Sequence, residues 1–293
     1  MSFALNIAHK RIMIDIKNFK TGELSDHGIY CLFDENDMFK AKACIIGPEG
    51  TPYENGYYMF DIEFPKQYPL YPPKVKFMTL NEKVRFNPNL YKSGKVCVSI
   101  LGTWSGPGWT SCMTLNTVLL SLQSLLHSNP IQNEPGWETE IGEKSASYNE
   151  MLSYYNFNVA IIDMINNPTQ GFEVFTDIMI EQLKKNSKHI YAKIKNFLHL
   201  DNKKVFSSIY SMGDILKYNE TFERFMEICS NNNIELDKGP IYDNISLNSK
   251  PIRKAPNSPA KSYEVGFVIK SENDGNNYKV ILQKNNIKKW VKV

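Results

Sequence analysis

The sequence of 293 residues lacks the marks of several common protein classes. No apolar run approaches the ~20 residues that a membrane-spanning helix needs. Its first residues, Met-Ser-Phe-Ala-Leu-Asn, show neither the basic start nor the apolar block of a secretory signal. The net charge is only +3, without the concentrated basic stripe that is typical of nucleic-acid binding. We therefore expect a protein of the cytoplasm, the nucleus or both, with neither a membrane nor a nucleic acid as partner.

Cysteine is scarce as well, with five residues at positions 31, 44, 97, 112 and 229. An odd number without any Cys-x-x-Cys pair argues against a disulfide framework and a structural zinc site, and it fits a reducing compartment. We expect no metal and no cofactor. Cys31, Cys44, Cys112 and Cys229 are interpreted as structural residues, the first two as buried small hydrophobes.

The N-terminal half has a regular hydrophobic pattern. Residues 4–19 carry the apolar stripe of an amphipathic helix, and strand-like runs follow at 29–33, 39–43 and 58–64. Short links rich in Gly and Pro separate the strands, which favours an antiparallel meander. The prolines of the segment 64–77 fix the backbone φ angle and predict a rigid extended crossing.

The C-terminal half is predicted to be mainly helical. Thr114 is the expected N-cap of a helix with a buried leucine stripe, and further helices are predicted at 144–166, at 172–198 and, as one or two helices, at 204–229. A run rich in Asn, Ser, Lys and Pro at 244–262 predicts a mobile linker.

A small β module is predicted at the C-terminal end. Strand patterns at 263–269 and 278–282 flank Asn273-Asp274-Gly275, a strong hairpin signal, and residues 287–293 provide a third strand. Such a module is marginally stable alone, so we hypothesise that it is a docking tag for a partner.

Cys97 is the candidate nucleophile because of the residues around it. It lies in a weakly periodic stretch, 78–113, and long loops inside compact domains are usually functional. An Asn-Pro-Asn turn ends at Asn89, eight residues before Cys97, and a Gly-Thr-Trp turn follows at 102–104. The histidines, at positions 9, 27, 127, 189 and 199, are all distant from Cys97 in sequence. A Cys-His hydrolase therefore has little support.

From residue 4 to residue 166 the sequence resembles the catalytic core of ubiquitin-conjugating enzymes. The matching motifs come in the order of that family: Gly47-Pro-x-Gly-Thr-Pro-Tyr-x-x-Gly56, Tyr68-Pro-x-x-Pro-Pro-x-Val-x-Phe77, Phe86-x-Pro-Asn89, Gly94-x-Val-Cys97, Ile100-Leu, Trp109 and Leu119-Leu-Ser-Leu-Gln-Ser-Leu-Leu126. Each motif is weak by itself, but their shared register over this stretch makes the resemblance specific.

Within the family, the sequence is similar to a large subgroup that has a helical C-terminal extension. Four features carry this likeness: Asn87 where most of the family has His, the insertion Gly102-Thr-Trp-Ser-Gly-Pro-Gly-Trp109, the run Asn129-Pro-x-x-Asn-Glu-Pro-Gly136, and Ser145-x-x-Tyr-Asn149. Residues 244–293 have no counterpart in this resemblance.

The resemblance implies an α+β fold, in which helices flank an antiparallel four-stranded meander sheet. With the patterns above, it divides the chain into a catalytic core at 1–168, a helical C-terminal extension at 169–243, a linker at 244–262 and a small β-meander module at 263–293.

The resemblance also implies a chemistry. Cys97 would take ubiquitin, or a ubiquitin-like protein, from an activating enzyme that uses ATP, and hold it as a thioester until a lysine or a ligase cysteine attacks. The Asn89 amide would stabilise the oxyanion or brace the loop, with a turn-stabilising Asx residue as the alternative. Asn87, where the family usually has His, is an auxiliary candidate, and the change matters little if that position is mainly structural. Glu134 matches a loop acid that helps to desolvate or orient the lysine, with a solvated loop acid as the alternative.

Contacts with partners are implied at two surfaces. Lys10, Arg11 and Lys17 resemble the first-helix face that meets the activating enzyme, although they also fit a solvated helix face. Leu70 stands where relatives place a ligase-binding aromatic, and Ser111 with Cys112 replaces a common Pro-Ala pair. We therefore expect weaker pairing with HECT-type ligases and altered pairing with RING ligases. Trp104 and Trp109 are expected to anchor the insertion in the core, with direct ligase contact as the alternative.

Three functions compete at this point. The first is an active ubiquitin-conjugating enzyme. The second is a non-catalytic adaptor with the same fold that binds ubiquitin or ligases, and the third is a thiol hydrolase. Cys97, Asn89 and the Gly94 turn favour the first.

Overall fold

The structure is a computed structural model that describes residues 3–19, 24–236, 260, 263–271, 275–282 and 288–293. The chain divides into two units, residues 1–237 and 238–293. In the described part of the chain, no helix is both long and apolar enough to cross a bilayer.

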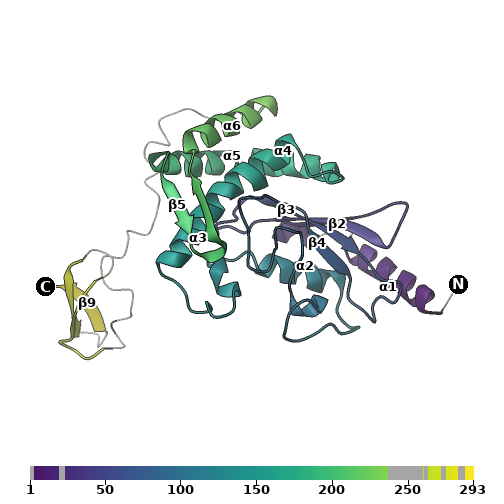
Figure 1. The fold of residues 1–293 in the computed structure, drawn as a ribbon, viewed down its shortest axis with the longest axis horizontal. Helices are drawn as coiled ribbons and strands as arrows, with labels where there is room; N and C mark the ends of the chain where they lie inside the picture. The colour runs from purple at the N-terminus through teal and green to yellow at the C-terminus, as the bar shows by residue number, and fades with distance from the viewer. Residues whose placement is uncertain (1–2, 20–23, 237–259, 261–262, 272–274, 283–287) are drawn as a thin grey trace. The chain divides into compact units, whose positions relative to one another are not determined.

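A four-stranded antiparallel meander forms the centre of the first unit (Figure 1). Its strands, in spatial order, are β1 (Ile29–Phe33), β2 (Lys40–Ile46), β3 (Tyr57–Glu63) and β4 (Lys74–Phe77). Short links join the first three strands, so each pairs with the next along the chain. The predicted four-stranded meander is confirmed.

The inner face of the sheet carries the aromatic core. Phe60 lies opposite both Ala43 and Phe77 in the register, and all three are buried. Phe86, from the loop after the sheet, packs edge-on against Tyr58 at 5.6 Å between ring centroids. Because strand side chains alternate between faces, this apolar row leaves polar residues such as Asp61 on the outer face.

Two helices predicted from the sequence complete the core. Helix α1 (Phe3–Phe19) buries Ala8 and Ile12, and α2 (Leu115–Ser124) buries Leu115, Val118, Leu119 and Leu122. Thr114 caps α2 as predicted, since its side chain accepts from the backbone N–H of Thr117, which bonds back to Thr114.

The helical prediction around 144–166 is confirmed, and the stretch at 143–166 is one continuous helix. It consists of α3 (Glu143–Tyr155), a π-helical stretch (Asn156–Asp163) and α4 (Met164–Asn166). The side chain of Asn156 donates to the Glu54 carbonyl at 2.9 Å and accepts from the Tyr58 hydroxyl at 2.7 Å. The helix is thereby joined to the sheet by buried hydrogen bonds.

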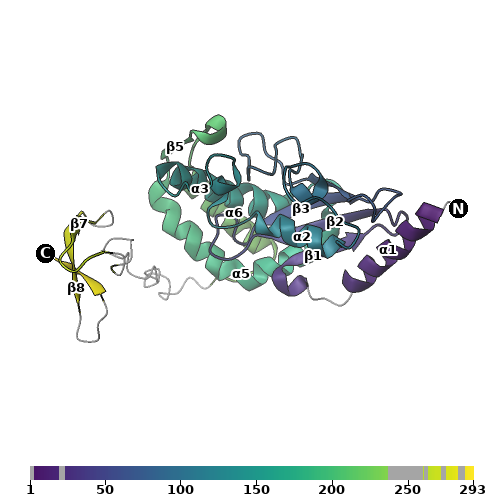
Figure 2. The same cartoon turned by 90° about the horizontal axis from the view of Figure 1, so that it is seen from below.

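The first helix of the C-terminal extension packs on the outer face of the sheet. Helix α5 (Thr176–Phe197) accepts a hydrogen bond from Tyr57 at the Met179 carbonyl, 2.9 Å, and Gln182 donates to the Tyr30 hydroxyl at 3.1 Å. Helix α6 (Tyr218–Asn231) lies beside α5 in both views (Figure 2). The predicted core and extension therefore form one packed unit.

A buried carboxylate holds α5 to the loop between β2 and β3. Glu54, which is 7% exposed, accepts from the Gly50 N–H at 3.0 Å, from Lys193 and from His189 at 2.6 Å. Burial raises the pKa of Glu54, but the hydrogen bond and charge of Lys193, with the other donors, outweigh burial and lower it.

The helical prediction for 204–215 is wrong. These residues form an antiparallel hairpin, β5 (Lys204–Ser207) and β6 (Met212–Ile215). Val205 and Ser207 are buried while Lys204 and Phe206 are exposed, which is the period-two alternation of a strand. The extension is therefore helical with a β-hairpin inserted.

Short helical turns connect these elements. They are Ser25–His27, Ser99–Leu101, Pro130–Asn133, Glu173–Phe175, Leu198–Leu200 and Ile209–Ser211.

The second unit is a three-stranded antiparallel sheet, as predicted. It consists of β7 (Val268–Lys270), β8 (Asn277–Leu282) and β9 (Lys288–Lys292), with a small core of Ala260, Tyr278, Val280 and Trp290. Apart from Ala260, the predicted linker at 244–262 lies outside the described residues, as do Asn273 and Asp274 of the predicted turn.

Candidate active site

Cys97 lies in a tightly folded loop that follows β4. Leu90 forms β-bridges with both Asn87 and Val96, which folds the loop back on itself before Cys97. Gly94 has a φ of +87°, and a Cβ on it would lie 2.8 Å from the Phe77 carbonyl oxygen. Only glycine fits this close approach of the loop to β4.

Asn89 is joined to Cys97 in two ways. The Cys97 N–H donates to the Asn89 carbonyl at 2.9 Å, and the Asn89 side-chain Nδ2 donates to the Cys97 carbonyl at 2.5 Å. Both residues are buried, and Asn89 Oδ1 has no hydrogen-bond partner among the described residues. The predicted pair is thus adjacent, and the amide braces the backbone that carries the thiol.

Asn87 is held by buried hydrogen bonds. It is fully buried, its Nδ2 donates to the Tyr53 hydroxyl at 3.1 Å and to the Leu125 carbonyl at 2.8 Å, and its Oδ1 accepts from the Asn89 N–H at 2.9 Å. Burial raises the pKa of Tyr53, so its hydroxyl stays protonated. Asn87 therefore connects the Asn-Pro-Asn turn to the end of α2.

All five cysteines are free thiols, but their environments differ. Cys97 is 1% exposed, so its sulfur must become uncovered before it reacts with a protein-sized thioester. Cys112 is exposed, while Cys31 is partly exposed. Burial raises the pKa of Cys44, and raises that of Cys229 to about 12, so both remain protonated near neutral pH.

Glu134 lies at the end of a short helical turn and contacts the C-terminal extension. Its carboxylate accepts a hydrogen bond from the hydroxyl of Tyr210, at the tip of the β5–β6 hairpin. The Tyr210 ring also contacts the guanidinium of Arg85, with 4.1 Å from the guanidinium carbon to the ring centroid. No local pattern in the sequence points to Tyr210 or Arg85, because the hairpin is predicted as helix and the contacts are distant in sequence.

The Arg11 side chain forms hydrogen bonds with backbone carbonyls of its own chain rather than extending into solvent. Its guanidinium donates to the carbonyls of Ser111 at 3.4 Å, Cys112 at 3.4 Å and Met113 at 2.7 Å, and it pairs with buried Asp15 at 3.8 Å. Burial raises the pKa of Asp15 above its ordinary value, and the hydrogen bond from Tyr68 offsets this rise only in part. Arg11 thus fixes the loop around Cys112 against α1.

The other predicted contact residues are accessible. Lys10, Lys17, Leu70 and Ser111 are all exposed, and their contacts with an activating enzyme or a ligase stay a prediction. Of the two tryptophans expected to anchor the insertion, Trp109 is half-buried and donates to the Pro69 carbonyl at 2.7 Å. Trp104 is 39% exposed, so that expectation is wrong for Trp104, which lies in an exposed run of the insertion.

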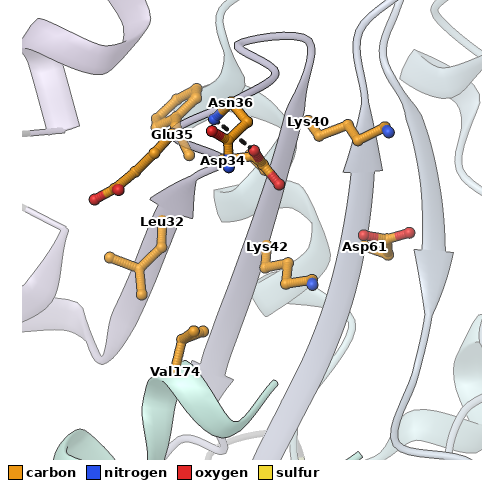
Figure 3. Close-up of a pocket in the computed structure, with 10 residues that line it drawn as sticks. Leu32, Asp34, Glu35, Asn36, Lys40, Lys42, Asp61 and Val174 are labelled. Carbon is orange, nitrogen blue, oxygen red and sulfur yellow. Dashed lines mark hydrogen bonds between the residues drawn. The ribbon is translucent and has the colours of Figure 1, made fainter. Parts of the chain in front are cut away.

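A hollow of 690 Å³ lies on the outer face of the sheet (Figure 3). Leu32, Lys42 and Asp61 line it from neighbouring strands, and Val174 lines it from the extension. None of the predicted site residues is among its lining residues. Within the described ranges, no three His, Cys, Asp or Glu side chains come together as metal ligands.

Comparisons with known proteins show which family this chain is similar to. A family model described as "Ubiquitin-conjugating enzyme" matches residues 11–156. Ubiquitin-conjugating enzyme E2 Z of Xenopus tropicalis is 42% identical over 175 residues, which cover 59% of this chain and 56% of that protein. The Homo sapiens protein of the same name is 42% identical over 175 residues, which cover 59% of this chain and 49% of its own. The predicted likeness to a large subgroup of the family is confirmed as a likeness to these proteins.

The chain spans about half the length of the curated relatives it matches (56% and 49%). The solved E2 domain of a Toxoplasma gondii ubiquitin conjugating enzyme is 26% identical, covers 52% of this chain and 98% of its own, and aligns with a TM-score of 0.41.

Proposed function

The chain belongs, through residues 11–156, to the ubiquitin-conjugating enzyme family, and we propose that it carries ubiquitin or a ubiquitin-like protein as a thioester on Cys97. The observation that supports this proposal is the pairing of Asn89 with Cys97, at 2.5 Å from the side-chain amide to the Cys97 carbonyl. The amide has a second N–H, which can donate to an oxyanion that forms beside the sulfur.

The proposed reaction has two transfers. In the first, the Cys97 thiolate attacks the thioester on an activating enzyme, a new C–S bond forms, and the enzyme's sulfur leaves as a thiolate. In the second, a lysine nitrogen or a ligase thiolate attacks the carbonyl carbon on Cys97, and the Cys97 sulfur leaves. When the acceptor is lysine, the proton that its nitrogen loses goes to solvent. No cofactor takes part, because ATP is consumed by the activating enzyme.

The proposed partners are the modifier, an activating enzyme and ubiquitin ligases. Lys10 and Lys17, both exposed on α1, are the proposed basic contacts for the activating enzyme, while Arg11, predicted with them, holds the loop around Cys112. Leu70, Ser111 and Cys112 are proposed to contact ligases. The free thiols fit a reducing compartment, so we place the protein in the cytoplasm, the nucleus or both.

A second function is favoured by one observation. Cys97 is only 1% exposed, and a thiol that stays covered would leave an adaptor that binds ubiquitin or ligases without carrying a modifier. The two functions differ in whether the sulfur ever becomes acylated.

A charging assay separates them. The protein is incubated with activating enzyme, ATP and ubiquitin, and then run on a gel without reductant. Carriage predicts a band shifted by one ubiquitin that a thiol reductant removes, a reductant-resistant oxyester for Cys97→Ser, and no shift for Cys97→Ala. Cys112→Ala is the control, because this exposed cysteine lies outside the Cys97 loop, and it should charge normally. A wild-type protein that does not charge with ubiquitin or any ubiquitin-like protein, but binds ubiquitin, would favour the adaptor.

A further inference from the structure

The tip of the β5–β6 hairpin contacts the loop that holds Cys97. The Arg85 backbone N–H donates to the Met212 sulfur at 3.2 Å, and Met212 is 2% exposed. The Arg85 guanidinium lies 3.7 Å from the Tyr91 ring centroid and 4.1 Å from that of Tyr210, and it donates to the Pro88 carbonyl. A part of the chain outside the matched family segment thus packs against the Asn-Pro-Asn turn.

Tyr210 is held in an unusual backbone conformation. Its φ is 59° and that of Ser211 is 49°, both in the left-handed region, where a residue other than glycine costs roughly 1–2 kcal/mol. Such strain persists only where surrounding contacts fix it, and it is often found at functional sites. Here the contacts are the buried Met212 and Tyr148, whose ring meets the Tyr210 ring edge-on at 6.2 Å.

The strained tip directs the Tyr210 hydroxyl onto Glu134. Burial is the main cause that raises the pKa of Tyr210, and the hydrogen bond to Glu134 raises it further. The hydroxyl therefore keeps its proton and acts as the donor. The bond occupies the Oε2 oxygen of Glu134. A carboxylate has a second oxygen, and among the described residues no hydrogen bond to Oε1 of Glu134 is present. Glu134 is half-buried, so part of the residue is accessible to an incoming group.

We propose that Tyr210 is a positioning residue for lysine transfer, which orients the Glu134 carboxylate so that its second oxygen accepts a hydrogen bond from the attacking lysine nitrogen. This inference rests on the proposed carriage of a modifier by Cys97. The lysine nitrogen forms a bond to the thioester carbonyl carbon and loses a proton to solvent, the C–S bond breaks, and the Cys97 sulfur leaves as a thiolate. Tyr210 itself touches none of the reacting atoms. The C-terminal extension therefore supplies part of the acceptor side of the site.

The test uses the full chain, already charged on Cys97 and separated from activating enzyme. Discharge is followed in single turnover with free lysine and, separately, with a small thiol, which needs no carboxylate to orient it. Tyr210→Phe keeps the ring on Arg85 and removes only the hydroxyl. We expect it to charge normally, to discharge to lysine roughly three- to tenfold more slowly, and to discharge to the thiol at the wild-type rate.

Two further variants make the test specific. Tyr155→Phe is the matched control, because the Tyr155 hydroxyl bonds to Asp214 of the same hairpin and its loss weakens hairpin docking without touching Glu134. It should discharge to lysine normally. In a Glu134→Ala background, Tyr210→Phe should have no additional effect, since its action passes through Glu134.

Several results would overturn the proposal. They are equal slowing of lysine and thiol discharge in Tyr210→Phe, the same lysine defect in Tyr155→Phe, a full Tyr210→Phe effect in the Glu134→Ala background, or wild-type lysine discharge in Tyr210→Phe. A wild-type protein that fails to charge at all would instead refute the proposed function, so the two failures are distinguishable.

Discussion

Replacing Asn89 tests what its amide does beside Cys97. In Asn89→Ala, the Cys97 carbonyl loses a donor at 2.5 Å in a site where Asn89 is 7% exposed and Cys97 is 1% exposed. Leaving a buried acceptor unpaired costs about 1–3 kcal/mol, and this should appear as a lower free energy of unfolding. The loss is partly offset because the unpartnered Oδ1 of Asn89 is removed as well, so we expect the lower half of that range.

The effect on lysine transfer should be larger than the effect on stability. If the second amide N–H donates to the oxyanion, its loss raises the transfer barrier by about 2.7–4 kcal/mol and slows discharge about 10²–10³-fold. A brace alone would slow discharge much less, because the backbone bond from Cys97 to the Asn89 carbonyl, at 2.9 Å, remains. Asn89→Asp keeps the shape but puts a carboxylate oxygen against the Cys97 carbonyl, so it should be less stable than Asn89→Ala.

Denaturant unfolding and single-turnover lysine discharge measure the two effects separately. Asn149→Ala is the matched control, since its amide also donates to a backbone carbonyl, that of Ser128 at 2.9 Å, but away from Cys97. It should leave discharge unchanged. Wild-type stability together with wild-type discharge in Asn89→Ala, or an Asn89→Asp more stable than Asn89→Ala, would refute the reasoning.

Two predictions concern other parts of the first unit. Glu54→Gln removes the carboxylate shared by Lys193 and His189 and should lower the free energy of unfolding at pH 7 by about 1–3 kcal/mol, measured by urea denaturation. Because the folded pKa of Glu54 lies below its ordinary value of 4.5, this difference should persist above that pH and shrink as the pH falls below it; a difference that grows in acid would contradict the assignment. In alkylation followed by mass spectrometry, exposed Cys112 should react with a bulky maleimide well before Cys97, which is 1% exposed. Equal rates would show that the Cys97 loop is open in solution.

The core elements could be predicted because their signals are local, and the Cys97–Asn89 pair because the motifs that carry the family resemblance are short and continuous in sequence. Each of these signals lies within a short stretch of sequence. They are the apolar stripe on α2, its Thr114 cap and the short spacing from Asn89 to Cys97. The hairpin at 204–215 was missed because Ile209 and Ile215 fit a helical spacing as well as a strand pattern. For such short apolar runs, tertiary packing decides between helix and strand.

Other site features could not be read from the sequence because they depend on distant contacts. Tyr210 meets Glu134 across 76 residues, and Arg11 binds the Met113 carbonyl across 102 residues. A basic residue on an amphipathic helix has the same local pattern whether it faces solvent or backbone carbonyls. Only the folded chain shows that Arg11 fixes the loop around Cys112, while Lys10 and Lys17 stay accessible.

The helix at 143–166 crosses the boundary of the segment shared with the family, which ends at residue 156. Asn156, at that boundary, is hydrogen-bonded to both Glu54 and Tyr58. The segment that the family model matches is thus shorter than the part of the chain that packs together as one unit. Anyone who transplants this catalytic segment into another scaffold, or trims the chain for crystallisation, should cut after the C-terminal helices rather than at the edge of sequence similarity.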